Sequence, residues 1–141
     1  MPGLAFEDAI ATSATGDLWL FRGRSLADRA IQTVTNSPVN HVGMAIALDD
    51  LPPLLWHAEL GRALPDAWSG RHHRGVQLHD LRGAVLQWGR RYGQRGWLRQ
   101  LSGPAEVGKE RPSKRSITCM SRSSCSRVSV PSSWRSQARW P

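Results

Sequence analysis

Two histidines and a carboxylate lie on neighbouring segments that both have the pattern of β-strands. His41 opens the apolar run HVGMAIAL, and His57 and Glu59 follow in LLWHAEL. Because alternate side chains of a strand share a face, His57 and Glu59 are on one face, and either could reach His41 if the strands pair. An imidazole held by a second polar group is the arrangement of a general base. The pattern alone leaves two interpretations open: His41 is a general base, or it is a strand-edge histidine bonded to a loop carbonyl.

The chain has two cysteines, Cys119 and Cys125, and either could be the nucleophile that such a base activates. A thiol with a pKa near 8.5 needs a helix N-terminus or an adjacent imidazolium to become a thiolate at neutral pH. The residues around Cys119, ITCMS, do not form an amphipathic helix. We therefore predict that Cys119 is inert rather than catalytic, and that Cys125 is a weaker candidate still.

Neither a cofactor nor a metal site is predicted. Two cysteines are too few for a disulfide framework and lack the partner pair of a zinc site. The adjacent histidines in GRHHRG, residues 70–75, would point in different directions, and no carboxylate cluster completes a ligand set around them. We interpret this stretch as a solvated loop, with contact at the rim of a substrate site as the alternative.

The elements that must position these side chains begin with GDLWLFRG, residues 16–23, which predicts a short and largely buried strand. Residues 25–37 then have the pattern of a helix, with Ser25 as N-cap and Asp28 in the first turn. Apolar residues at helical spacing predict one inward face, made of Leu26, Ala30, Ile31 and Val34.

Three strands are predicted after this helix, over residues 41–48, 54–60 and 75–81, with a loop at 61–75. In the third strand, GVQLHDL, we expect Val76 and Leu78 on the buried side. Residues 82–93 predict a short helix or turn. The five tryptophans of the predicted domain are expected to fill the core or cover its edge; they are Trp19, Trp56, Trp68, Trp88 and Trp97. A strand, a helix and an antiparallel meander imply an α+β domain with a helix packed on one face of the sheet.

The segments GDLWLFRG, SPVNHVGMAI, LLWHAEL and HRGVQLHDL, in this order and spacing, resemble the circularly permuted papain-like cysteine amidases and peptidases related to NlpC-type enzymes. More distant members of that group are the lecithin:retinol acyltransferases. The resemblance covers residues 16–101, about the first two-thirds of such a domain. It implies a permuted papain-like core with an antiparallel sheet and a packed helix, incomplete at its C-terminus.

In that family the histidine comes first, on a strand, an orienting polar residue follows on the next strand, and the cysteine comes last, at the start of a helix. The resemblance therefore implies that His41 is the base and His57 its orienting partner, with Glu59 as the competing residue. Cys119 falls nearest to the position of the nucleophile. The expected sequence, an aromatic residue followed by Cys, Ser or Ala, Glu, Leu and Val, is absent from this chain.

The last 40 residues have a different composition. Residues 1–100 hold 11 Lys or Arg against 9 Asp or Glu, whereas residues 101–141 hold 8 against 2. Residues 111–141 contain ten serines, no acidic residue and no apolar periodicity. Such a segment buries too little apolar surface to offset the entropy of ordering. We predict an N-terminal extension at 1–15, a domain at 16–101, and a basic tail at 102–141 that is either disordered or the product of a shifted reading frame.

These features predict a cysteine hydrolase acting on an amide or related acyl bond of a small-molecule, peptide or acyl substrate, impaired in this chain. Two alternatives stay open: a non-catalytic module whose basic tail binds nucleic acid or an anionic membrane, and a protein like the lipid acyltransferases. Nucleic acid is not expected to bind the nearly neutral folded part. Without a secretory signal pattern or an apolar run of about 20 residues, the chain is expected to be cytoplasmic.

Overall fold

The computed structural model describes residues 3–101 and 125–129, and these form a mixed α+β fold around a seven-stranded sheet. The elements, in chain order, are β1 (Leu4–Ala5), α1 (Phe6–Ala11), β2 (Leu18–Arg22), α2 (Leu26–Val34), β3 (His41–Leu48), β4 (Leu51–Glu59), β5 (Gly75–Asp80), α3 (Leu81–Arg90), β6 (Arg95–Arg99) and β7 (Cys125–Ser129). The strands lie in the order β1-β7-β6-β2-β3-β4-β5. Every neighbouring pair is antiparallel except β1 and β7. The predicted α+β class and antiparallel meander are confirmed.

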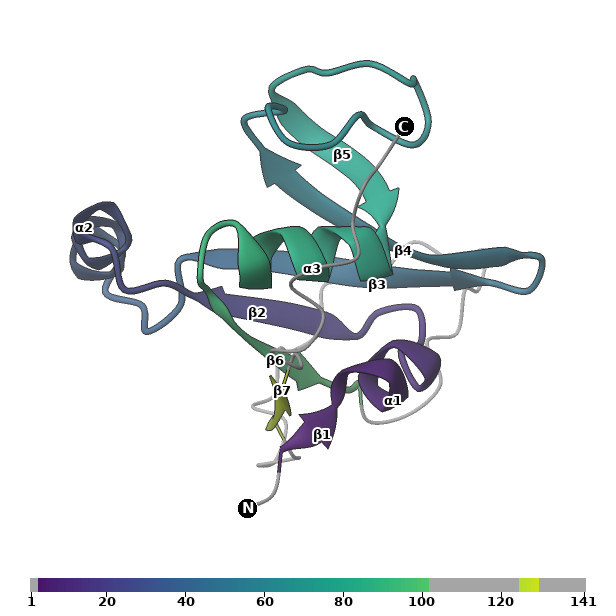
Figure 1. Cartoon of the computed structure of the whole chain (residues 1–141), viewed down its shortest axis with the longest axis horizontal. Coiled ribbons are helices and arrows are strands. Elements are labelled where there is room, and N and C mark those ends of the chain that lie inside the picture. Colours follow the sequence, from purple (N-terminus) through teal and green to yellow (C-terminus); the bar gives the residue numbers. More distant parts are fainter. Residues whose placement is uncertain (1–2, 102–124, 130–141) are drawn as a thin grey trace, which may run out of the picture.

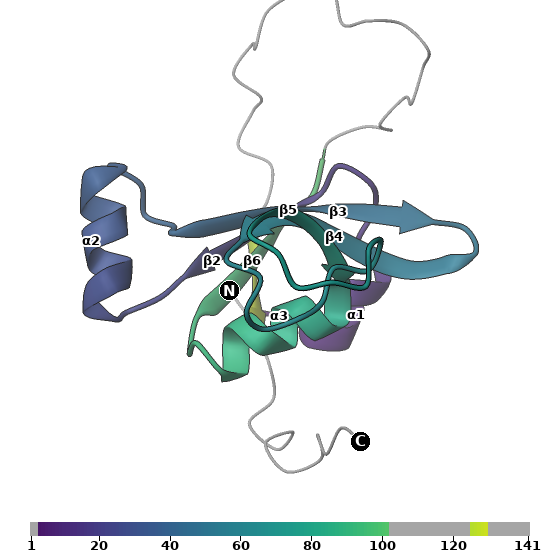
Figure 2. The same cartoon turned by 90° about the horizontal axis from the view of Figure 1, so that it is seen from above.

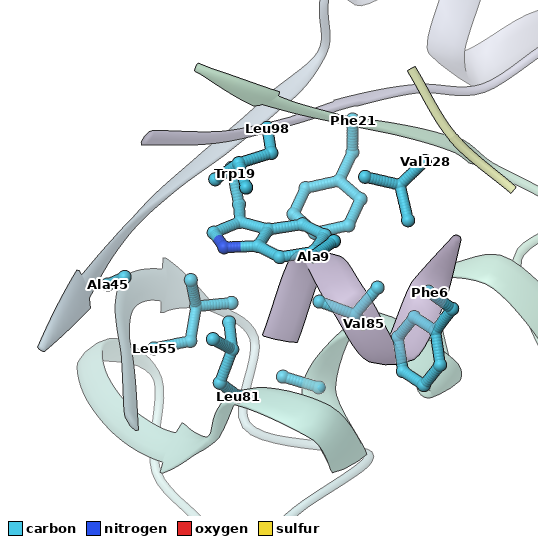
Figure 3. Packing of buried hydrophobic residues seen from close by; sticks show 11 residues of the cluster. Phe6, Ala9, Trp19, Phe21, Ala45, Leu55, Leu81, Val85, Leu98 and Val128 are labelled. Carbon is cyan, nitrogen blue, oxygen red and sulfur yellow. The ribbon is translucent and has the colours of Figure 1, made fainter. Parts of the chain in front are cut away.

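Helices α1 and α3 lie on the same side of the sheet, and the core fills the space between them and the strands (Figure 2). Trp19 and Phe21 of β2, Leu55 of β4 and Leu81 of α3 are completely or almost completely buried there (Figure 3). Phe6 and Ala9 of α1 join the same cluster, so the predicted N-terminal extension contributes to the core. Burial of this apolar surface is the main force that holds α3 across the sheet.

The predicted inward face of the helix at 25–37 is wrong. Helix α2 projects beyond one end of the sheet (Figure 1), and Leu26 and Val34 are 85% and 86% exposed. The helix is instead attached through polar contacts: Asp28, buried, closes a capping box with Ser25 and accepts a hydrogen bond from the Asn40 side chain. The helices that pack on the sheet are α1 and α3, and α3 begins directly after β5 with the Asp80 side chain as its cap.

Strand β5 also faces the opposite way to the sequence prediction. Pairing with β4 places Gln77 opposite His57 and His79 opposite Leu55, so the odd-numbered residues point toward the helices. Gln77 and His79 are buried, whereas Val76 is 55% exposed. The register with the neighbouring strand therefore overrides the apolar alternation within β5. Trp68, at 88% exposed, likewise lies outside the core in which the tryptophans were expected.

Most of the predicted basic tail lies outside the described residues, but Cys125–Ser129 forms β7 between β1 and β6. Val128 of this strand is buried in the core cluster. Within the described residues, no helix is long and apolar enough to cross a membrane.

If β7 contributes to the fold, replacing Val128 by Ala should lower the free energy of unfolding by about 1–3 kcal/mol, the range expected for a buried aliphatic side chain. The matched control is Arg127→Gln, because Arg127 is exposed on the same strand. Chemical denaturation of both variants measures the difference. Equal stability of the two variants would show that residues 125–129 do not pack as described.

Candidate active site

Three histidines form a continuous chain of hydrogen bonds across β3, β4 and β5. His41 Nε2 lies 2.7 Å from His57 Nδ1, and His57 Nε2 lies 2.8 Å from His79 Nδ1. The predicted proximity of His41 and His57 is thus confirmed. His57 and His79 are buried, whereas His41 is half-buried at the start of β3. The hydrogen-bonded histidines run diagonally across the helix-covered face of the sheet, from the half-buried His41 on β3 to the buried His79 on β5.

Gly43 creates the space in which the first two rings meet. It lies two residues from His41 on the same face of β3 and pairs directly with His57 of β4. A Cβ at this position would lie 2.7 Å from the Leu55 side chain and 3.2 Å from the Cβ of His57. A side chain at position 43 would therefore displace His57 or Leu55, which gives the glycine of HVG a packing role.

Helix α3 covers His41 with an aromatic ring. The Trp88 indole stacks on the imidazole with the ring centroids 3.8 Å apart and the planes 15° from parallel. Phe21 of β2 and His57 of β4 contact other sides of the same imidazole. These contacts restrict the ring to one orientation, so that its Nε2 points at His57.

Polar contacts fix the backbone immediately before His41. The Asn40 side chain donates to Asp28 and accepts from the amide of Gly23, which ties the start of β3 to the end of β2 and to α2. Gln94, which precedes β6, donates to the same Asp28 carboxylate. Hydrogen bonds to the end of β2, to α2 and, through Asp28, to the residue before β6 thereby fix the backbone at Asn40 and His41.

A cavity of about 690 Å³ opens beside the histidines, lined by α2, the ends of β3 and β4, and α3. Its wall includes His41, Glu59 and Trp88, together with Arg62 and Arg74 from either end of the loop between β4 and β5. Since His41 Nε2 bonds to His57, Nδ1 is the nitrogen of His41 left for a group in the cavity. A space of this size accommodates a small-molecule or short peptide substrate.

Burial keeps the histidines neutral. It lowers the pKa of His41 from 6.5 to about 4. The pKa of His57 falls to about 3, first because of burial and then because of the charges that His41 and His79 would carry. Burial also lowers the pKa of His79. The neutral imidazole is the form that can accept a proton, but a pKa well below the working pH makes a weak base. An anionic group beside the His41 ring would raise the pKa of this histidine.

Two proton arrangements satisfy a chain of three neutral rings, because each ring carries one N–H. In the first, His41 donates to His57 and His57 donates to His79, which leaves His41 Nδ1 without a proton and free to act as a base. In the second, both bonds reverse and His41 Nδ1 carries the proton. His79 Nε2 is buried and makes no hydrogen bond of normal geometry with a described residue, although the Leu64 carbonyl is close enough to raise the pKa of the ring.

Glu59 does not orient His41. Its Oε1 atom is buried without a hydrogen-bond partner among the described residues, and burial raises the pKa of this carboxyl. Its ligand atom lies within 4.8 Å of those of His57 and His79, two imidazoles and one carboxylate in a single cluster. Of the two orienting candidates from the sequence, His57 makes the contact with His41.

The loop between β4 and β5 carries the other two histidines, and its form agrees with the interpretation of GRHHRG as a solvated loop. Both are bonded to backbone carbonyls, His72 to that of Gly61 and His73 to that of Val76. Asp66 anchors the loop by accepting from the amides of Ser69 and Leu78, and these bonds lower the pKa of its carboxyl to about 2.

No cysteine of the described ranges, 3–101 and 125–129, lies beside His41. Cys119 lies outside the described residues. Cys125 is exposed on β7, and strands β6 and β2 separate it from β3. Three strand spacings alone amount to roughly 14 Å, too far for proton transfer to His41. Cys125 is therefore excluded as the partner of His41 in this arrangement.

Two residues of the site were missed from the sequence. His79 was not among the candidates, because the apolar residues expected on the buried side of its strand were Val76 and Leu78; the spacing of two from Gln77 puts His79 and Gln77 together on the other face. Trp88 packs against the core as expected, but its stacking on His41 was not predicted. Helical spacing along α3 could place Trp88 on the side facing the sheet, but no local pattern identifies His41 as the residue that it contacts.

No family model, no curated protein and no solved structure matches this chain.

The neutral state of the buried rings predicts a pH-dependent stability. The unfolded histidines bind a proton below about pH 6.5, whereas folded His41 and His57 do so only near pH 4 and pH 3. The unfolded chain thus binds more protons than the folded chain in this range, so the free energy of unfolding should fall as the pH falls from 6.5 to 4. Near pH 5 the slope of this free energy against pH should correspond to about two protons taken up by these rings on unfolding.

Urea denaturation at a series of pH values measures this slope. In His41→Gln the slope of the free energy of unfolding against pH should be smaller by about one proton, because one buried titrating ring is gone. A free energy of unfolding that does not change between about pH 6.5 and pH 4 would contradict the described burial of the rings.

Proposed function

We propose that this protein is a hydrolase of an amide or related acyl bond, in which His41 is the general base. The observation that supports this best is the hydrogen-bonded chain His41–His57–His79 beside the cavity. A histidine oriented by a second polar side chain, with its other nitrogen available to a ligand site, is the arrangement by which enzymes activate a nucleophile.

Each residue of the chain has a distinct role in this proposal. His41 Nδ1 takes the proton of the nucleophile as it attacks the acyl carbon, and returns it to the leaving nitrogen or oxygen as the acyl bond breaks. His57 is a positioning residue that accepts from His41 Nε2–H and so keeps Nδ1 free of a proton. His79 positions His57 in the same way. Trp88 holds the plane of the base against α3.

The permuted papain-like class is the finer part of the proposal. The base on one strand and its orienting residue on the next, in that order along the chain, agree with this class, as does the helix packed across the sheet. No described cysteine lies beside His41, and without a neighbouring anion burial makes the base weak. The hydrolase is therefore proposed to be impaired.

The walls of the cavity indicate what kind of acyl group would fit. Ile31, Leu60, Trp88 and Tyr92 supply apolar and aromatic surface, and Arg62 and Arg74 supply positive charge. These residues suit a substrate with an apolar portion and an anionic group, since guanidinium groups form paired hydrogen bonds with carboxylate or phosphate.

Hydrolysis of an activated nitrophenyl ester by the full chain tests the role of His41. We expect His41→Ala to lower the protein-dependent rate by about 100-fold, the lower limit for loss of a general base. His73→Ala is the matched control, because His73 is an exposed loop histidine with its ring bonded to a backbone carbonyl. A rate in His41→Ala equal to that of the control would exclude His41 as the base.

The same preparations show whether a thiol is active. We expect an amide-mimicking electrophile to label Cys119 no faster than the exposed Cys125. Rapid and stoichiometric labelling of Cys119 that disappears in His41→Ala would show an intact nucleophile and contradict the proposed impairment.

Binding of nucleic acid is a second candidate function. The charge balance predicted it for the basic tail and not for the folded part, but one group of side chains on the sheet favours it. Arg22 and Arg95 are paired on β2 and β6, and Arg127 lies on the next strand, β7. All three are exposed, and the charges of Arg24, Arg127 and Arg22 contribute to lowering the pKa of Arg95. Four cations close enough to repel one another form a site that releases counterions when phosphates bind.

Replacing Arg22 and Arg95 together by Gln should reduce the slope of log affinity for single-stranded DNA against log salt by about 1.4, because two phosphate contacts are lost. This pair is a cleaner test than removing residues 111–141, which also removes β7 from the sheet. An unchanged slope would exclude this surface as the binding site.

A further inference from the structure

We propose that His57, Glu59 and His79 form a binding site for a divalent transition-metal ion such as Zn²⁺. One ligand atom from each residue lies within 4.8 Å of the other two. His57 and His79 are 4% and 2% exposed, and Glu59 is half-buried on the cavity wall. The cluster is thus enclosed by β4 and β5 and open to the cavity at its carboxylate.

The donor atoms are those that zinc prefers. Two imidazole nitrogens and one carboxylate oxygen make up the protein ligands of several catalytic zinc sites, in which a fourth position is left for water or substrate. Imidazole and carboxylate donors also suit the neighbouring first-row metals, whereas the hard cations Ca²⁺ and Mg²⁺ prefer oxygen ligands alone.

The two imidazoles already face each other. His57 Nε2 and His79 Nδ1 lie 2.8 Å apart, and a single proton joins them. An ion bound to both at about 2.0–2.1 Å in a tetrahedral shell would set these nitrogens about 3.3 Å apart. The rings would therefore separate by only about 0.5 Å, which a small rotation of each side chain provides.

Glu59 supplies a reason for a cation at this position. Its Oε1 atom is buried and has no hydrogen-bond partner among the described residues. A buried carboxylate is costly unless it is paired, hydrogen-bonded or bound to a metal. Gln77 lies opposite His57 in the register of β4 and β5, on the same face of the sheet. Its buried Oε1 atom also has no hydrogen-bond partner among the described residues. Two buried acceptor oxygens without a described partner, Glu59 Oε1 and Gln77 Oε1, therefore lie on the face of the sheet that carries the proposed site.

Metal binding would determine which proton arrangement the histidine chain adopts, a consequence that rests on the proposed function. An ion on His57 Nε2 confines the remaining proton of that ring to Nδ1, which then donates to His41 Nε2. Neutral His41 must in turn carry its own proton on Nδ1. The nitrogen proposed as the base would then have no free lone pair, so that the bound ion would inhibit hydrolysis.

Titration of the full chain, first treated with a chelator, tests the site directly. We expect one Zn²⁺ per chain by calorimetry, and one Co²⁺ with the visible absorption of a four-coordinate ion. Glu59→Gln, which keeps the size of the side chain, should weaken Zn²⁺ binding at least about tenfold. His79→Ala should reduce it further, and His73→Ala should bind as the wild type does, because His73 lies outside the cluster.

The thermal unfolding midpoint gives a second measurement that does not depend on activity. A ligand that binds only the folded state raises this midpoint, so Zn²⁺ should stabilise wild type and His73→Ala but not Glu59→Gln. Equal Zn²⁺ affinity in wild type, Glu59→Gln and His79→Ala would overturn the proposal, as would the absence of stoichiometric binding by the wild type. Both results are independent of ester hydrolysis by the metal-free protein, which tests the base.

Discussion

His57 uses both of its ring nitrogens, one toward His41 and one toward His79, and its side chain is only 4% exposed. A buried polar group that loses its partner costs about 1–3 kcal/mol, so the three rings stabilise one another only as a set. The geometry depends on the registers of two strand pairs at once, β3 with β4 and β4 with β5. A slip of one residue in either pair would turn a histidine to the opposite face of the sheet. Gly43 leaves the space for the first contact, and α3 closes the site with Trp88.

This polar set occupies positions that an ordinary core would fill with aliphatic side chains. On the helix-covered face, β4 and β5 contribute His57, Gln77 and His79 beside a single large aliphatic residue, Leu55. Apolar residues lie instead on the other face, where Trp56 and Val76 are about half exposed. The main apolar packing is displaced toward β2, α1 and the start of α3. Such a distribution is costly for stability and is typical of sites where proteins place reactive or ligand-binding groups.

Local sequence patterns were sufficient where local physics decides the structure. The strand at 18–22, the helix start at Ser25 and Asp28, and the His41–His57 contact all follow from caps, alternation and pairing of adjacent strands. Local sequence patterns were insufficient where contacts with distant segments decide the structure. The face of β5 is set by its register with β4, and α2 is attached by Asp28 rather than by its apolar stripe. Strand β7 has no strong pattern of its own and depends on pairing with β1 and β6.

In the proposed site, His41, His57 and His79 form one neutral chain with His41 Nδ1 as its free end. Nitrogen NMR of the ¹⁵N-histidine-labelled, metal-free protein at neutral pH distinguishes a protonated ring nitrogen from a bare one. We expect His41 and His57 to be both protonated at Nε2 and bare at Nδ1, so that each bond in this arrangement of the rings has one donor and one acceptor. A His57 ring protonated on both nitrogens, or a His41 ring protonated at Nδ1 in the absence of metal, would contradict it.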